Sequence, residues 1–265
     1  MRLAGSSGSV PWDSSILAMP SRWFLPIPDL DPSRVKLGFV HAAFSRWFDA
    51  AEGESPSASR VDHEANDKPY TISPPTRLNG TVGVELAVLT EEAEQLLLAA
   101  ARDGVSARLG NQTRQIRAPR LLRRQPYDVL AAGPHGTRWE LAILSPLTFR
   151  SGDRATPLPS VATVLGGLGR AWSLWCEPRE PLRRDELGKV WVSDVDLVSE
   201  LLTLTVGGRP LHIPAATGSL TLRCEPGVAD RVAPLIRFAS YAGIGSMTRR
   251  GLGVVEVREA GAQVA

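Results

Sequence analysis

Hydrophobic and polar residues alternate along the chain in two spacings, one typical of strands and one typical of helices. In the first half the helical spacing is clearest after Thr90, an N-cap residue that is followed directly by Glu91 and Glu92. The elements that we expect in this half are a strand region over 16–27, a helix over 34–51, strands over 70–78 and 82–88, a helix that ends at Gly104, and strand spacing through 107–117.

The second half shows a similar order of elements. We expect a strand over 139–144, a helix over 160–175, strand material over 189–195, 201–206 and 219–224, a helix over 229–241, and a final strand over 254–257. Each half thus approximates strand, helix, strand, strand, helix, strand, which is the order of a ferredoxin-like unit. Pro126 and Gly136 interrupt the periodicity, so a boundary is predicted near 125–137. The sequence predicts an α+β protein of two tandem ferredoxin-like domains with antiparallel sheets, over 10–126 and 138–260.

The charge of the chain is nearly balanced overall but uneven locally. A net charge of +2 over 265 residues excludes a generally basic nucleic-acid coat, and 43% hydrophobic residues can fill substantial cores. Residues 102–124 contain seven arginines and a single acid, Asp103, whereas 52–67 contain five acids and a single base, Arg60. Such a basic stripe can bind phosphate, and a solvated strand or helix face is the alternative interpretation.

The two cysteines, Cys176 and Cys224, have no paired spacing. This pattern argues against a disulfide framework and a zinc site, and it favours a reducing cytoplasm. The chain also lacks a His-x-x-x-His motif, so we expect no metal and no cofactor. No apolar run reaches membrane-spanning length, so we expect no membrane partner.

A glycine-rich run near the C-terminus follows an apolar helical pattern and leads directly into a strand. It holds two arginines between two pairs of glycines: Gly243, Gly245, Arg249, Arg250, Gly251 and Gly253. Dinucleotide-binding and Walker-type loops have the opposite order, with a helix after the loop to hold phosphate. We therefore expect a cradle of backbone and arginine side chains for a phosphodiester chain, with a plain hairpin as the alternative.

Three further stretches of sequence precede this glycine-rich run. They are GFVHAAF at 38–44, KPYTISP at 68–74 and SPLTFRSG at 145–152. In this order, with the glycine-rich run last, they resemble the CRISPR-associated endoribonucleases that cut repeat-derived precursor RNA into guide RNAs. The resemblance extends from about residue 23 to residue 257. It implies tandem ferredoxin-like domains with a cleft that accepts an RNA strand or hairpin stem.

Metal-free RNA cleavage needs only a base for the 2′-OH, an acid for the leaving 5′-oxygen, and cations or amides that stabilise the phosphorane. Its products are a 2′,3′-cyclic phosphate and a 5′-OH. In the family that this chain resembles, a histidine shortly before the Lys-Pro-aromatic-Thr motif commonly acts in cleavage, and His63 matches it in position. An exposed linker histidine is the alternative for this residue.

Three other residues are catalytic candidates. His41 lies in the first predicted helix, where a histidine or tyrosine contributes to catalysis in some relatives, and a core-edge histidine bonded to a backbone carbonyl is the alternative. Lys68 and Tyr70 are expected to stabilise the phosphorane or to position RNA, although Tyr70 also suits strand packing. His135 and His212 lie outside these motifs and are expected to be structural.

The leading hypothesis is a metal-independent endoribonuclease that is specific for CRISPR repeat RNA. Arg249, Arg250 and the glycine-loop amides would contact phosphates, with Arg150 and Arg154 as further RNA contacts. A non-catalytic RNA-binding subunit of a CRISPR interference complex is the first alternative, and a small-molecule enzyme that binds a nucleotide is the second. Repeat RNA is the expected partner, and other CRISPR effector subunits or a second copy of the chain remain open.

Overall fold

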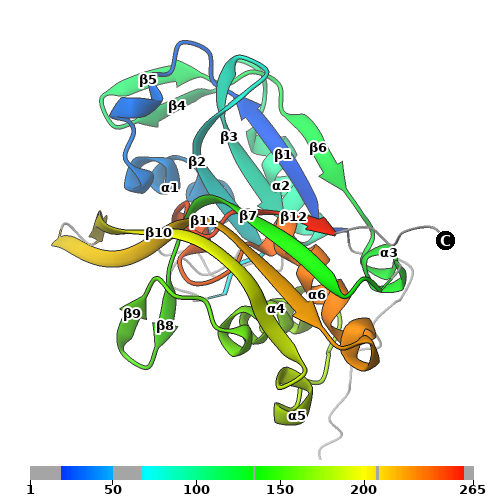
Figure 1. The fold of residues 1–265 in the computed structure, drawn as a ribbon. Helices are drawn as coiled ribbons and strands as arrows, with labels where there is room; N and C mark the ends of the chain where they lie inside the picture. The colour runs from blue at the N-terminus through cyan, green and yellow to red at the C-terminus, as the bar shows by residue number, and fades with distance from the viewer. Residues whose placement is uncertain (1–18, 50–66, 134, 207–208, 260–265) are drawn as a thin grey trace, which may run out of the picture.

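The computed structural model describes residues 19–49, 67–133, 135–206 and 209–259. It contains two four-stranded antiparallel sheets, one from each half of the chain (Figure 1). The first sheet has the order β2-β3-β1-β6 and the second β10-β11-β7-β12. Counted within each half, both orders are second, third, first, fourth. The expected pair of ferredoxin-like units is therefore confirmed.

The first half comprises β1 (Ser21–Pro26), α1 (Leu37–Phe44), β2 (Tyr70–Leu78), β3 (Thr81–Val88), α2 (Glu91–Ala100), the β4–β5 hairpin (Ser106–Leu109 and Gln112–Gln115) and β6 (Arg120–Arg124). The predicted cap of α2 is confirmed, because the Thr90 side chain accepts a hydrogen bond from the backbone N–H of Ala93 at 3.2 Å. The strand structure predicted through 107–117 is confirmed as the β4–β5 hairpin, which turns at Gly110 with φ +70°.

The helix predicted over 34–51 is too long. α1 ends at Phe44 and continues as a 3-10 turn over Ser45–Trp47, after a separate 3-10 turn over Pro32–Arg34. A 3-10 turn places residues three apart on one face. Phe44 and Trp47 therefore both reach the core, where their rings meet edge to face at 4.9 Å.

The second half comprises α3 (Tyr127–Ala132), β7 (Arg138–Leu147), β8 (Phe149–Ser151), β9 (Arg154–Thr156), α4 (Val161–Trp175), α5 (Arg184–Leu187), β10 (Val190–Val206), β11 (Arg209–Cys224), α6 (Ala229–Ala242) and β12 (Val255–Glu259). The two strands predicted over 189–195 and 201–206 are one strand, β10, because β11 pairs with it along its whole length. α3 lies where we predicted a boundary, and its Tyr127 packs against Trp172 of α4 at 5.1 Å.

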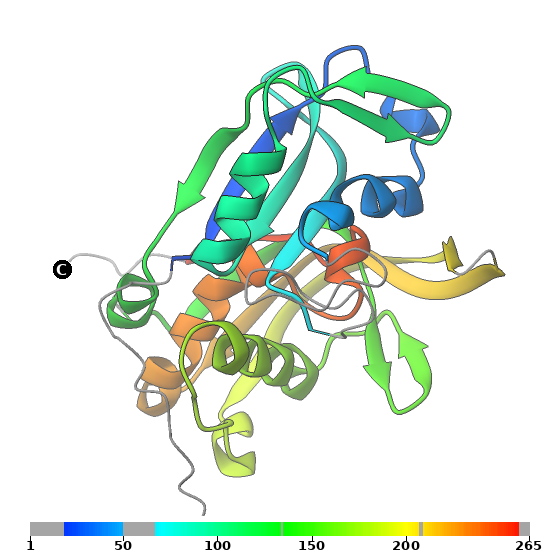
Figure 2. The ribbon, with the colours of Figure 1, turned by 180° about the vertical axis from the view of Figure 1, so that it is seen from behind.

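Each sheet has its own hydrophobic core beneath its helices (Figure 2). α2 covers the first sheet, and α4 and α6 cover the second. No helix among the described residues is long and apolar enough to span a membrane. The domain bounds 10–126 and 138–260 remain proposals.

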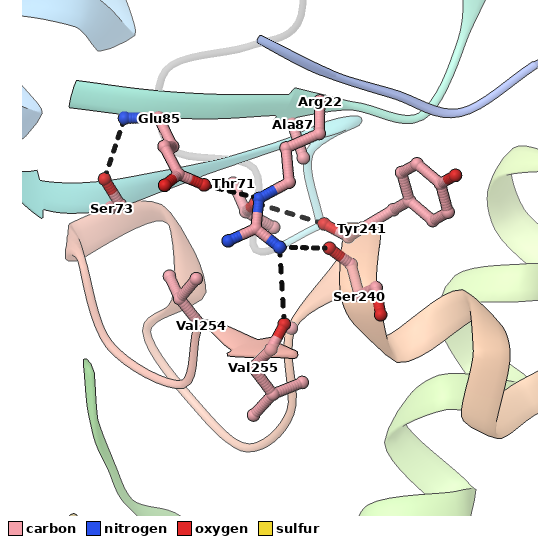
Figure 3. Close-up of a pocket in the computed structure, with 10 residues that line it drawn as sticks. Arg22, Thr71, Ser73, Glu85, Ala87, Ser240, Tyr241, Val254 and Val255 are labelled. Carbon is pink, nitrogen blue, oxygen red and sulfur yellow. Dashed lines mark hydrogen bonds and ion pairs between the residues drawn. The ribbon is translucent and has the colours of Figure 1, made fainter. Parts of the chain in front are cut away.

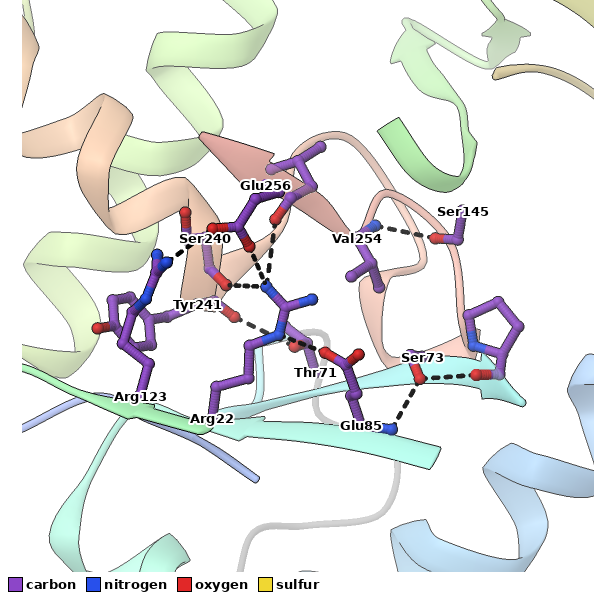
Figure 4. Close-up of polar contacts among 12 residues, drawn as sticks. Arg22, Thr71, Ser73, Glu85, Arg123, Ser145, Ser240, Tyr241, Val254 and Glu256 are labelled. Atoms are coloured by element: carbon purple, nitrogen blue, oxygen red, sulfur yellow. Dashed lines mark hydrogen bonds and ion pairs between the residues drawn. The ribbon is translucent and has the colours of Figure 1, made fainter. Parts of the chain in front are cut away.

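A buried arginine joins the two halves. Arg22 of β1 is 5% exposed, and its Nε lies 2.5 Å from Glu85 of β3. Its Nη1 lies 3.4 Å from the Ser240 carbonyl oxygen of α6 (Figure 3). The same nitrogen lies 3.0 Å from Glu256 of β12. Arg123 of β6 also pairs with Glu256, at 2.7 Å (Figure 4). These ion pairs fix how the first sheet lies on α6 and β12.

Candidate functional site

The glycine-rich run forms a closed loop between α6 and β12. The backbone N–H of Ile244 donates to the Gly253 carbonyl at 2.9 Å, which closes the base of the loop. The N–H groups of Ser246 and Gly253 donate to the carbonyls of Thr148 and Pro146, at 2.8 and 2.9 Å. The loop is therefore held by the 145–152 stretch, so two of the sequence motifs lie side by side.

The glycines are required by the backbone of this loop. Gly245 has φ +84°, and a Cβ there would lie 2.4 Å from the Thr148 carbonyl oxygen. Gly253 has φ +67°, and a Cβ would lie 1.9 Å from the Ile244 carbonyl oxygen. Since the amides of Ile244, Ser246 and Gly253 donate to carbonyls inside the protein, they are not the phosphate-binding amides of the expected cradle.

The two loop arginines lie in a 3-10 turn, Thr248–Arg250, that contacts the other two motifs. Leu37 of α1 and Pro74 of β2 lie close to Gly251, directly after this turn. His41 Nδ1 of α1 donates to the Arg249 carbonyl oxygen at 3.1 Å. All four motifs thus surround one position between the two sheets.

His41 is a neutral imidazole at neutral pH. Burial, together with the charges of Arg250 and Arg249, lowers its pKa to about 4. Its bond to a backbone carbonyl is the contact that the core-edge alternative predicts. The ring therefore holds the arginine turn against α1, and its catalytic role remains a prediction.

Lys68 and Tyr70 share a buried carboxylate, that of Asp49. Lys68 Nζ forms an ion pair with Asp49 Oδ1, and the two side chains are 1% and 3% exposed. Tyr70 donates its hydroxyl to the same oxygen at 3.2 Å and stacks on Phe48 at 4.2 Å. Burial and the Asp49 charge raise the pKa of Tyr70 well above its usual value. Sequence reasoning missed Asp49, the only acid between Asp31 and Glu52.

A cleft of about 430 Å³ lies beside these residues. Its walls come from the start of β2, α4, β8 and the glycine loop, and four arginines line it: Arg150, Arg170, Arg249 and Arg250. Three of these were expected from the sequence. Arg170 was missed, although it is the only charged residue of α4. Arg154 is exposed on β9, in the hairpin that also carries Arg150.

A sequence model of the CRISPR-associated endoribonuclease Cas6 matches residues 141–255. Cas6 of Thermus thermophilus (TTHB231) is 25% identical, with a TM-score of 0.62 over 91% of this chain and 99% of that chain. A second Cas6, TTHA0078, is 18% identical, with a TM-score of 0.72 over 91% of this chain and 99% of that one. This chain thus carries a Cas6 sequence match in its second half, and it shares the fold of solved Cas6 endoribonucleases over 91% of its length.

The Cas6 likeness covers both halves of the chain. A Cas6-related protein of Pyrococcus furiosus is 12% identical and has a TM-score of 0.57 over 91% of this chain and 100% of that chain, which extends the shared fold to a distant relative. No curated protein matches the chain in sequence. The matched family is one of CRISPR-associated endoribonucleases, which is the family that the four motifs resemble.

The remaining residues that the sequence singled out either lie away from the cleft or fall outside the residues that the structure describes. His63, with the rest of 50–66, lies outside the described residues. His135 and His212 are exposed, and His212 Nδ1 lies 3.0 Å from Thr203 Oγ1 across the β10–β11 hairpin. Among the described residues, no group of three or more His, Cys, Asp or Glu side chains could hold a metal ion.

The basic stripe at 102–124 has in part a structural role. Arg123 pairs with Glu256, and Arg124 pairs with Glu94 at 2.6 Å. The Arg124 guanidinium also lies over the Trp23 ring, 5.8 Å from its centre. Arg102, Arg108, Arg117 and Arg120 are exposed. The two arginines nearest the second half therefore stabilise the fold through these contacts.

Proposed function

We propose that this Cas6-family protein cuts CRISPR repeat RNA without a metal ion, by attack of a 2′-OH on the adjacent phosphate. The observation that carries the proposal is a cleft that four arginines line and to which three of the motifs contribute, while the fourth motif holds the arginine turn through His41. Arginines placed there stabilise a phosphorane by charge and hydrogen bonds. The products are a 2′,3′-cyclic phosphate and a 5′-OH, and the protein acts in the cytoplasm.

The proposed roles of the described residues rest on the geometry, and that of His63 rests on its position in the sequence. Arg249 and Arg250 contact phosphates from the glycine loop, and Arg150 and Arg154 contact RNA from the β8–β9 hairpin. His63 transfers the proton that cleavage requires. Lys68 and Tyr70 act through Asp49, because both bond to its carboxylate, so they position the start of β2 rather than meet the phosphate directly.

Related Cas6 structures support RNA binding in this fold. TTHA0078 was solved as a product complex, as a substrate-mimic complex and as a variant with one histidine replaced by alanine. A protein 14% identical to this chain is described as a RAMP protein that binds different RNA substrates. We infer that repeat RNA is the partner of the cleft.

A second candidate function is RNA binding without cleavage, as a subunit of a CRISPR interference complex. It is favoured by the contacts of His41, Lys68 and Tyr70. The polar atoms of these three side chains bond to other groups of the protein. Under this alternative the cleft binds repeat RNA and leaves it intact.

One experiment separates the two functions and tests metal independence. Purified protein is incubated with the CRISPR repeat RNA of its own genome, in excess EDTA and in Mg²⁺, and the ends of any product are mapped. We expect equal cleavage in both buffers, with a 2′,3′-cyclic phosphate and a 5′-OH. Binding without cleavage would establish the second candidate, and cleavage that requires Mg²⁺ would contradict the metal-free reaction.

A further inference from the structure

An ion pair crosses the RNA cleft between the two halves of the molecule. Asp67, just before β2, and Arg170, on α4, both line the cleft. Arg170 Nη2 lies 2.5 Å from Asp67 Oδ2, and Arg170 Nε lies 3.3 Å from Oδ1. The contact is a bidentate fork, the geometry with which a guanidinium also binds a phosphate group.

The pair is well placed to exchange partners. The Arg170 and Asp67 side chains are 67% and 37% exposed, so water screens their attraction, and such pairs contribute little to stability. By contrast, the buried Lys68–Asp49 pair next to it is closed to solvent. An incoming phosphate can therefore replace the Asp67 carboxylate at little cost, whereas Asp49 is not replaceable in this way.

The charges along the cleft favour the exchange. Among the described residues that line it, Asp67 is the only acid, against Lys68 and the four arginines. A phosphodiester chain in the cleft meets Arg150, Arg249 and Arg250 on the glycine-loop side and Arg170 on the α4 side. In this structure the Asp67 carboxylate neutralises Arg170 on the α4 side.

We propose that Arg170 is a phosphate-binding residue for the RNA, and that Asp67 holds its guanidinium until a phosphate of the RNA takes the place of the carboxylate. Asp67 is thus a built-in competitor that lowers RNA affinity and keeps Arg170 in its bidentate orientation. This inference rests on the proposed function, because it assigns a further contact to the same RNA.

The test is a double-mutant cycle on RNA affinity. Dissociation constants are measured at several KCl concentrations for the wild type, Arg170→Ala, Asp67→Ala and the double variant. The probe is the repeat RNA with a 2′-deoxy residue before the scissile phosphate, checked to be intact after binding. Arg183→Ala and Asp185→Ala serve as matched controls. Asp185 lies in α5 and Arg183 directly before it, and this exposed ion pair is not part of the cleft lining.

The two halves of the pair have opposite expected effects. Arg170→Ala weakens binding and lowers the slope of log affinity against log salt by about 0.7 to 0.9, the contribution of one phosphate contact. Asp67→Ala tightens binding by about two- to fivefold, which corresponds to the strength of an exposed ion pair. In the Arg170→Ala background, Asp67→Ala changes RNA affinity less, since the Asp67 carboxylate then has no Arg170 guanidinium to hold. The α5 controls bind as the wild type does.

The proposal is overturned if Arg170→Ala keeps the wild-type affinity and salt slope, or if Asp67→Ala weakens binding. It is also overturned if Asp67→Ala tightens binding equally in both backgrounds, because the effect is then long-range charge alone. Cleavage of the all-ribose repeat RNA by the wild type is measured in parallel. Where the wild type cuts and the cycle fails, this inference alone is wrong, and where the wild type neither binds nor cuts, the proposed function fails with it.

Discussion

Asp49 changes the ranking of the candidate catalytic residues. Its carboxylate bonds both Lys68 and Tyr70 in a buried cluster, and the His41 ring is bonded to a loop carbonyl. Three of the four candidates that the sequence suggests therefore have polar atoms engaged by the protein. This leaves His63 as the residue that we expect to transfer a proton during cleavage.

The first prediction compares the two histidines. His63→Ala is expected to lower the single-turnover cleavage rate at least about a hundredfold, the contribution of a general acid or base, while RNA affinity stays near wild type. His41→Ala is expected to slow cleavage less and to lower the melting temperature, because it releases the arginine turn from α1. Normal cleavage by His63→Ala alongside a folded but inactive His41→Ala would reverse the assignment.

The second prediction concerns the pH dependence of stability. The pKa of His41 is about 4 in the folded protein, below its ordinary value of 6.5, so the unfolded chain takes up the proton first as the pH falls. The contribution of neutral His41 to stability is thus present above pH 6.5 and is lost between pH 6.5 and 4. The melting temperature of the wild type should fall more steeply over this interval than that of His41→Gln, which has no titrating ring. Parallel curves would show that His41 does not titrate in this way.

At the scale of elements, the helices and strands with regular spacing were predicted well. β2, the cap residue Thr90 and the end of α4 at Trp175 agree with the expected bounds, because alternation and capping are encoded locally. The β8–β9 hairpin, β6 and α3 were missed. β6 is an edge strand whose five residues are all exposed, so no alternation marks it in the sequence. α3 follows Pro126 within a segment rich in breakers, and it is helical because Tyr127 and Leu130 pack into the second core.

The third prediction tests whether the glycine loop needs its glycines. Gly245→Ala is expected to lower the free energy of unfolding by roughly 1–2 kcal/mol for a left-handed residue, and by about 1–3 kcal/mol more for the backbone shift that the clash with Thr148 requires. Gly152→Ala is the matched control, because Gly152 also has a positive φ, +65°, but nothing lies within 4 Å of its Cβ position. Chemical denaturation measures both changes. Equal losses in the two variants would show that close packing at Gly245 is unimportant.

At the scale of the whole molecule, the sequence predicted two similar units but not how they meet. The motifs in the two halves were expected to share one function, and their contact through His41 and the glycine loop agrees with this. Arg22, Glu85 and Glu256 were not singled out. Each is an ordinary charged residue in a strand, and only the packing of the first sheet on α6 and β12 brings them together. Such a contact has no local sequence signal.

The fourth prediction tests this junction. Arg22→Met leaves Glu85 and Glu256 without their shared cation, so it is expected to lower the free energy of unfolding by about 3–5 kcal/mol. Arg183→Met is the control, since the exposed Arg183–Asp185 pair should contribute less than about 1 kcal/mol. Denaturant unfolding of both variants measures the difference. A small loss for Arg22→Met would show that the two halves are held together by other contacts.

The most direct measurement of the central claim is cleavage of a repeat RNA in which a single 2′-OH, on the nucleotide before the scissile phosphate, is replaced by hydrogen. The proposed reaction uses that hydroxyl as its nucleophile. We predict that the substituted RNA binds with the affinity of the unmodified RNA and is not cut, while an RNA with the same substitution one nucleotide further upstream is cut normally. Cleavage of the first RNA at the same phosphate would contradict the account, because the attacking oxygen would then come from elsewhere.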